Sequence, residues 1–361
     1  MRKLAGIILC VLAVLTGCAT APRRAARSDN RPPDWDHGVP ATKQPESAPL
    51  PAVASALPAP SAPISAAPEL TWIALNRWLE EHGLGPLRRV AAGPVESYAL
   101  VSPRGVMRFN MGSLVARWEE MEVRLGFAPQ LANDTVLFHA LDVAKNIEPL
   151  LRGYVPVAKL DRLVVIDPGH GGSNLGTSSV ADARAEKHFT LDWALRLAPL
   201  LEANGWRVLL TRTNDVDVAL ADRVAFAEEH RADLFISLHF NSAGNGNREA
   251  TGLETFCLTP TGMASSLTRG EADDPAQIFP NNAFDGQNLM YAARLHAAVL
   301  RAGGQADRGV RRARFLTVLR GQNRPAVLIE GGFLSNAAEA RRVTDPAFRQ
   351  RLAEGVAEAL R

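Results

Sequence analysis

Between Leu163 and Arg361, short apolar runs alternate with longer segments of helical period. The apolar runs are LVVID, RVLLT, LFISL, LETFCL and AVLIE, and each has the length of one buried strand. The segments between and after them predict helices over 188–204, 220–230, 287–302 and 346–360. Buried strands that alternate with helices form a mostly parallel sheet flanked by helices, so this region is predicted to be α/β.

Two prolines bear on these predicted helices. Asp345 can cap the last helix, and Pro346 suits its first turn. Pro199 lies inside the first helix, where a proline loses a hydrogen bond and costs about 3 kcal/mol or more. We therefore expect a kink or a break at Pro199.

The N-terminal segment has the features of a lipoprotein signal peptide. Arg2 and Lys3 precede an apolar run from Leu4 to Leu15, which is shorter than the roughly 20 residues that a membrane span needs. The sequence then continues Thr16-Gly17-Cys18, which resembles the lipobox of bacterial lipoproteins. We expect removal of residues 1–17 and acylation of Cys18. The alternative is ordinary secretion with an incidental cysteine.

Residues 18–69 are expected to form a linker. This stretch holds eleven of the 24 prolines, much Ala and Ser, and almost no large apolar residues, so it cannot build a core. Of the three cysteines, Cys10 leaves with the signal peptide and Cys18 carries the lipid. Only Cys257 then remains, which excludes an intrachain disulfide, and its apolar surroundings predict a buried strand residue.

The sequence of residues 70–155 predicts a second, smaller unit of α+β type. Apolar residues at helical spacing in TWIALNRWLEEHGL predict a helix that includes Trp72. SYALV and VMRFN predict strands, with turns at 102–105 and 133–134, and 137–151 closes the unit. The unit resembles the copper-amine-oxidase N-terminal-like modules of envelope proteins. Its His82 and His139 are interpreted as ordinary, partly buried histidines.

The charge balance argues against nucleic acid as a partner. Lys and Arg total 40 against 38 Asp and Glu, which leaves little positive charge to neutralise a phosphate backbone.

Two histidines directly follow predicted strands. His170 lies in VVIDPGHGG, where glycines let the backbone bend tightly, and His239 ends ISLHFN. Ligands bind at the carboxyl ends of strands in an open α/β sheet, so the two imidazoles can converge although 69 positions separate them. Glu186 adds a carboxylate near a helix start. Two imidazoles and one carboxylate are a ligand set of catalytic zinc. Taken singly, each residue has a structural alternative, such as helix capping for Glu186.

Glu330 ends the buried strand AVLIE and precedes two glycines. A carboxylate in such an apolar setting must be paired, bound to a metal, or used in acid–base chemistry, because burying it bare is costly.

The region from Leu163 to Leu360 resembles the zinc-dependent N-acetylmuramoyl-L-alanine amidase family of cell-wall hydrolases. The motifs that carry the resemblance occur in order: DPGHGG, the pair Glu186-Lys187, GWRVLLTRTND, the L-x-x-R of 220–223, ADLFISLHFNS, GLETF, RGVRRARFLTVLRG with Thr317 interposed, and PAVLIEGGFLSN. The resemblance implies a phosphorylase/hydrolase-like fold with one zinc ion. It assigns the metal ligands to His170, Glu186 and His239, and the catalytic glutamate to Glu330.

The implied reaction cuts the amide bond between the lactyl group of N-acetylmuramic acid and L-alanine of the peptidoglycan stem peptide. Candidate substrate-binding residues are Arg308, Arg311, Arg312, Arg314 and Asn241, since arginine suits the carboxylates of stem peptides. For the arginines, a solvated or salt-bridged face is the alternative. Asp167 could orient a ligand histidine, or have a turn role instead.

Two further features depart from this pattern. His188 lies two residues from Glu186 and is a possible rival ligand. The stretch 260–288 has no helix or strand period, so it is either a lid over the substrate or a passive excursion.

We expect an enzyme of the bacterial cell envelope, anchored by lipid on Cys18 and facing the periplasm, with the outer membrane as one location. Its partners would be peptidoglycan and the membrane. A zinc peptidase or deacetylase acting on another amide, and an inactive peptidoglycan-binding lipoprotein, are the rival hypotheses.

Overall fold

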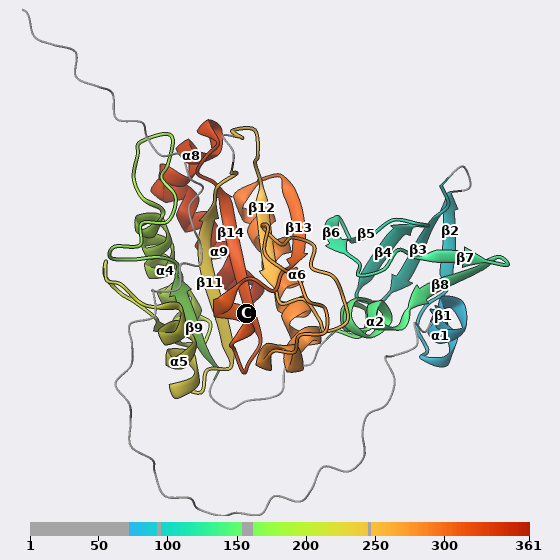
Figure 1. Cartoon of the computed structure of the whole chain (residues 1–361). Helices are drawn as coiled ribbons and strands as arrows, with labels where there is room; N and C mark the ends of the chain where they lie inside the picture. Colours follow the sequence, from blue (N-terminus) through green and yellow to red (C-terminus); the bar gives the residue numbers. More distant parts are fainter. Residues whose placement is uncertain (1–71, 92–94, 154–161, 245–246) are drawn as a thin grey trace, which may run out of the picture. The chain divides into compact units, whose positions relative to one another are not determined.

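The computed structural model describes residues 72–91, 95–153, 162–244 and 247–361 (Figure 1). The predicted signal peptide, Cys18 and the linker over 18–69 lie outside the described residues. Within the described ranges, no helix is both long enough and apolar enough to cross a membrane.

Six strands form the sheet of the C-terminal region, in the order β10-β9-β11-β14-β12-β13 (Figure 1). All neighbours are parallel except β12 and β14, which are antiparallel. The predicted mostly parallel α/β sheet is thus confirmed. The strands are β9 (Leu163–Pro168), β10 (Arg207–Leu210), β11 (Leu234–Asn241), β12 (Leu253–Cys257), β13 (Asp307–Arg312) and β14 (Ala326–Phe333).

Helices cover both faces of this sheet because the buried strands are apolar on both sides. In β9, Val164 and Ile166 belong to one core, which includes residues of α4 (Glu186–Ala203), α6 (Asp285–Gly303) and α9 (Pro346–Ala359). Leu163 and Val165 point into the other, which includes Ala227 of α5 (Leu220–Glu229). Two shorter helices follow, α7 (Thr317–Arg320) and α8 (Ala337–Thr344).

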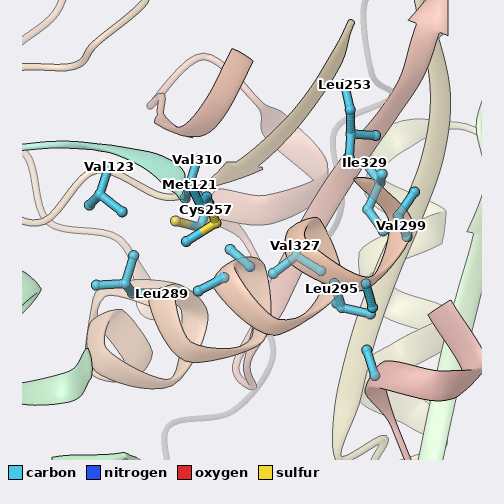
Figure 2. Packing of buried hydrophobic residues seen from close by; sticks show 14 of the residues in the cluster. Met121, Val123, Leu253, Cys257, Leu289, Leu295, Val299, Val310, Val327 and Ile329 are labelled. Carbon is cyan, nitrogen blue, oxygen red and sulfur yellow. The ribbon is translucent and has the colours of Figure 1, made fainter. Parts of the chain in front are cut away.

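The larger core is packed by α6 against the sheet. Figure 2 shows Leu295 and Val299 of α6 beside Val327 and Ile329 of β14. Cys257 lies in the same core, is completely buried and forms no disulfide, as expected for a strand residue.

The helix that contains Pro199 does not break. Helix α4 continues through this proline, which lies on the exposed side, where water can satisfy the freed carbonyl of the preceding turn. The other expectation, a kink at Pro199, stays a prediction. Strand β13 is not among the strands predicted from the sequence, because its arginine-rich run has no clear apolar period; Arg308 and Arg311 of this strand form ion pairs with neighbouring carboxylates.

The N-terminal module has the expected mixture of strands and short helices. One three-stranded sheet, in the order β1-β8-β7, comprises β1 (Trp72–Ala74), β7 (Gln130–Ala132) and β8 (Thr135–His139). Five antiparallel strands follow in sheet order: β6 (Met121–Arg124), β5 (Val115–Trp118), β4 (Gly105–Asn110), β3 (Ser97–Ser102) and β2 (Leu87–Ala91). The helical segments are α1 (Leu75–Glu81), α2 (Ala140–Asp142), a π-helical turn (Val143–Ile147) and α3 (Glu148–Arg152).

The expected helix at the start of this module is partly wrong. Trp72 lies in strand β1, opposite His139 of β8, and the helix begins only at Leu75. The predicted turns at 102–105 and 133–134 are confirmed, the second with both residues in the left-handed region. One residue pair, Val123 and Val310, joins β6 to β13. The division into two domains between 155 and 160 stays a prediction.

The last helix offers a test of the capping argument. The Asp345 side chain accepts a hydrogen bond from the backbone N–H of Ala347, as the sequence predicts. Asp345→Ala should lower the free energy of unfolding by about 1 kcal/mol, because one N–H of the first turn loses its acceptor. Urea denaturation measures this loss. Asp345→Asn keeps the acceptor and serves as the control; equal midpoints for all three proteins would contradict the capping role.

Candidate metal centre and active site

Three of the predicted site residues converge at one edge of the sheet. His170 follows β9, Glu186 opens α4, and His239 lies near the end of β11. All three are buried, and one possible ligand atom from each lies within 4.8 Å of the others. His170 Nε2 is 3.1 Å from Glu186 Oε2, and His239 Nδ1 is 3.1 Å from Glu186 Oε1.

The backbone around His170 is built for close approach. His170 itself has a φ of 61°, a left-handed conformation that costs free energy for a residue with a side chain. A Cβ at Gly169 would overlap the His239 ring, and a Cβ at Gly176 would lie 2.6 Å from Glu186 Oε2. The glycines of this loop therefore let the backbone pass beside the presumed ligands.

The side chain of Asn174 orients the His170 ring. Its Oδ1 lies 2.8 Å from His170 Nδ1 and also accepts from the N–H of Gly176. When His170 Nδ1 donates to this oxygen, Nε2 is left as the ligand atom that faces Glu186, which is how an outer partner fixes the tautomer of a ligand histidine.

Two buried arginines donate hydrogen bonds to the backbone of the loop that contains His170. Arg223 donates to the carbonyls of Pro168 and His170, and Arg212 donates to those of Pro168 and Gly169. Asp167 is completely buried and pairs with Arg223 at 2.6 Å. Burial alone would raise the pKa of Asp167, but Arg223 outweighs it and holds the pKa below its ordinary value.

Asp167 also accepts from the hydroxyls of Thr211 and Ser237. Its hydrogen bonds therefore serve the arginine that holds the His170 loop, while Asn174 contacts the ring itself. Arg223 lies in the L-x-x-R of 220–223 and Arg212 in GWRVLLTRTND, but neither motif by itself gives its arginine a role, and Asn174 lies outside both.

The three candidate ligands shift one another's pKa values. Burial would raise the pKa of Glu186, yet the neighbouring His170 and His239 hold it far below its ordinary value, so this carboxylate is ionised. Burial pushes the pKa of His170 down, but Glu186 outweighs burial and raises it. Burial lowers the pKa of His239, which favours the neutral imidazole that binds metals.

This donor set fits a metal ion. An ionised carboxylate and two imidazoles are hard and borderline ligands that suit a divalent cation such as zinc, and the glycines leave room for their close approach. His188, the rival ligand, is exposed and is not part of the cluster.

Glu330 lies beside this cluster with one oxygen unsatisfied. It is opposite His239 in the pairing of β14 with β11, and it is only 3 % exposed. Its Oε2 is buried without a hydrogen-bond partner. Burial and the nearby charge of Glu186 raise the pKa of Glu330 well above its ordinary value. A carboxylate whose pKa is raised is a stronger base than an ordinary glutamate, so it can accept a proton and later return it.

Arg269 is a residue of the site that sequence analysis missed. It comes from the 260–288 segment, and its guanidinium lies 4.0 Å from Glu330 Oε1 and 3.4 Å from Asn241 Oδ1. The segment thus brings one positive charge to the candidate general base. Without helix or strand period in the segment, no sequence signal singled out Arg269.

Arg308, Arg311 and Asn241 gather around a second glutamate. Glu254 lies opposite Glu330 in the pairing of β12 with β14. Arg308 donates to its Oε1 at 3.0 Å, Arg311 lies 3.7 Å away, and Asn241 donates to its Oε2 at 2.7 Å. Both arginines remain partly exposed, so their predicted contact with substrate stays a prediction.

Arg312 and Arg314 lie deeper. Arg312 donates to the carbonyl of Leu258 and to Asn146, and Arg314 pairs with Asp273 at 2.6 Å. Each is about 4 % exposed, and these contacts anchor neighbouring segments. Their predicted role in substrate binding is supported by no contact of the described residues and stays a prediction.

An α/β sheet with two imidazoles and a carboxylate at its carboxyl edge, beside a buried proton-accepting carboxyl group, defines a metal-dependent hydrolase. Residues 164–361, more than half of the chain, match the model of the N-acetylmuramoyl-L-alanine amidase family. The chain belongs to this family, and the predicted enzyme class is confirmed.

Individual relatives agree with the family. The chain is 34% identical over 199 residues to the sporulation-specific N-acetylmuramoyl-L-alanine amidase of Bacillus subtilis (strain 168). The aligned residues cover 55% of this chain and 66% of that protein. It is 30% identical over 218 residues to the amidase AmiA of Escherichia coli (strain K12), which covers 55% of this chain and 74% of AmiA.

Among solved structures, the catalytic domain of the amidase CwlV from Bacillus (Paenibacillus) polymyxa var. colistinus is 32% identical, with a TM-score of 0.45, and covers 55% of this chain and 96% of that domain. The residues that match the family model, 164–361, all lie in the C-terminal region.

A graded series of variants tests the metal centre. His170→Ala and His239→Ala should lose nearly all bound metal, because each removes one of three ligands. Asn174→Leu should weaken metal affinity by about 10- to 100-fold, since it removes the partner that fixes the His170 ring. Elemental analysis and chelator competition measure both effects. His188→Ala is the control and should bind normally; full occupancy in both ligand variants would contradict the site.

Proposed function

We propose that this chain hydrolyses the amide bond between the lactyl group of N-acetylmuramic acid and L-alanine of the peptidoglycan stem peptide, with one zinc ion held by His170, Glu186 and His239. Family membership carries the choice of bond. The cluster of three buried ligand groups beside Glu330 supports hydrolysis that depends on a metal.

Zinc bound at these residues would supply Lewis acidity, which lowers the pKa of a water molecule and polarises a carbonyl oxygen. Glu330 then accepts a proton from the attacking water. After attack on the lactyl carbonyl, Glu330 returns a proton to the departing nitrogen of L-alanine, as one group can serve as base and then acid. The products are free glycan and free stem peptide.

The surroundings of Glu330 suit this double role. Burial and the nearby Glu186 favour its neutral form, while Arg269 at 4.0 Å favours the charged form. A raised pKa makes the Glu330 carboxylate a stronger base than an ordinary glutamate, while Arg269 favours the charged form that must accept the proton.

Charged groups near the same edge could hold the substrate. Arg308 and Arg311 are partly exposed and could exchange part of their contact with Glu254 for a stem-peptide carboxylate. Arginine forms two parallel hydrogen bonds with a carboxylate, so it suits this class of substrate.

Glu330→Gln tests the mechanism. The amide keeps nearly the same volume but cannot accept the proton, so turnover of soluble muropeptide should fall by at least about 10²- to 10⁴-fold. Mass analysis of the products measures turnover, and elemental analysis should show unchanged metal. Glu229→Gln, at an exposed site on α5, is the matched control.

Two outcomes would contradict this assignment. Loss of metal in Glu330→Gln would make Glu330 a ligand, and full turnover would mean that another group is the base.

We extend the proposal to location. The Thr16-Gly17-Cys18 sequence after an apolar run supports lipid attachment at Cys18, and the proline-rich 18–69 stretch supports a tether between the lipid and the folded regions. The protein would then act from the cell envelope, facing the periplasm, with 70–155 as an accessory module and 160–361 as the catalytic domain.

Cys18→Ser tests the anchor. Without a thiol to acylate, the protein should move from the detergent phase to the aqueous phase in a detergent-partition assay. Cys257→Ser is the control, because Cys257 is buried in strand β12 and cannot be acylated in the folded protein. If Cys18→Ser leaves the distribution unchanged, the anchor lies elsewhere.

A further inference from the structure

The sheet of the N-terminal module has one buried face and one exposed face. On the buried side, Leu100, Met107 and Phe109 are at most 2 % exposed. Residues that lie opposite one another on adjacent strands share a face. β2 pairs with β3, β3 with β4, and β4 with β5 (Figure 1). These pairings place the residues that alternate with the core residues on the outer face.

Three arginines stand in one register line across this outer face. Arg88 of β2 pairs with Ala99 of β3, Ala99 pairs with Arg108 of β4, and Arg108 pairs with Arg117 of β5. We name Arg88, Arg108 and Arg117 the arginine row. Each of them is exposed, and only the short Ala99 side chain lies between the first two.

The arginine row is scarcely neutralised by the protein. Arg108 lies 3.8 Å from Glu120, but Glu120 is 89% exposed and the contact is long for an ion pair. Arg117 donates to the backbone carbonyl of Glu120, not to its carboxylate. Within the described ranges, neither Arg88 nor Arg117 forms an ion pair. Glu122 of β6 lies directly opposite Arg117 at the end of the row, but its carboxylate is paired with Arg311 at 3.3 Å.

The position of Arg108 directly opposite Arg117 is unfavourable in the free protein. Like charges opposite each other on neighbouring strands destabilise a sheet. Adjacent strands are about 4.8 Å apart, so the two side chains leave the sheet close together, and Arg88 lies two strands, roughly 10 Å, from Arg108. An anionic ligand along the row would remove the repulsion and gain several contacts at once.

We propose that the arginine row binds carboxylates of peptidoglycan stem peptides and so holds the enzyme on the intact wall. The proposal rests on the proposed function for the choice of polymer. Arginine binds carboxylates through paired hydrogen bonds, and a wall polymer presents many carboxylates, so three contacts act together. The row does not contribute to chemistry, and soluble fragments are hydrolysed without it.

The test compares three full-length proteins that carry Cys18→Ser, so that no acyl chain contributes. One has an otherwise native sequence. The row variant carries Arg88→Gln, Arg108→Gln and Arg117→Gln. The control variant carries Arg77→Gln, Arg152→Gln and Arg301→Gln, which removes the same charge at exposed arginines that are paired with Glu81, Glu148 and Glu358.

Binding to purified sacculi is measured by co-sedimentation in a Glu330→Gln background, so that the wall is not digested. The row variant should bind about tenfold more weakly, because each exposed charge contact contributes modestly and three are lost. The control variant should bind normally. Binding of the native row should weaken with salt and with sacculi whose carboxylates have been converted to amides.

A further variant with lysine at the three positions keeps the charge but loses the paired hydrogen bonds, so its binding should lie between that of the native row and that of the row variant. Circular dichroism and thermal unfolding should show that all variants are folded, since the changed side chains are exposed. Equal binding by the row and control variants, or undiminished binding to amidated sacculi, would overturn the proposal. The proposal would also be overturned if the row variant bound sacculi normally and lost binding only to phosphatidylglycerol vesicles. That result would assign the row to lipid headgroups.

Hydrolysis of soluble muropeptide tests the proposed function independently of wall binding by the arginine row. With Glu330 intact, the row variant should hydrolyse soluble muropeptide at the native rate. If none of the proteins hydrolyses it, the proposed function fails whatever the binding result. If only the row variant loses this hydrolysis, the row belongs to catalysis and the proposal is wrong.

Discussion

The Glu186 carboxylate is the interaction on which the site depends. It is completely buried at the N-terminus of α4, and both of its oxygens are held. Oε1 accepts from the N–H of Phe240 and lies near His239, while Oε2 accepts from the N–H of Thr177 and lies near His170. A bare charge in this position would be prohibitively costly. One carboxylate therefore fixes a loop, a helix and a strand relative to one another before any metal binds.

The buried Arg212 and Arg223 also fix the His170 loop, through hydrogen bonds to its backbone. Burial and the neighbouring Arg223 lower the pKa of Arg212 to about 10, so the Arg212 guanidinium remains charged at neutral pH. Their donors go mainly to backbone carbonyls of the loop that follows β9. A left-handed histidine persists only where surrounding contacts determine its backbone, and these donors provide such contacts.

The parts of the site predicted from sequence are those tied to regular structure. His170, His239 and Glu330 end or follow apolar strands, whose period is visible in the sequence, and a parallel sheet brings such ends together. Arg269 was not predicted, because it lies in a segment without period. Trp72 was assigned to a helix because its spacing fitted one, but pairing with β8 decided otherwise.

Two glutamates that face each other across β12 and β14 show how the environment separates roles. Glu254 accepts hydrogen bonds from Arg308 and Asn241 and lies near Arg311, so both of its oxygens have partners. Glu330 is opposite it, with a buried oxygen that has no partner. Leaving the buried oxygen of Glu330 without a hydrogen bond costs about 1–3 kcal/mol of folding free energy. A fold that satisfies one glutamate fully and leaves its neighbour unsatisfied keeps the second free for proton transfer.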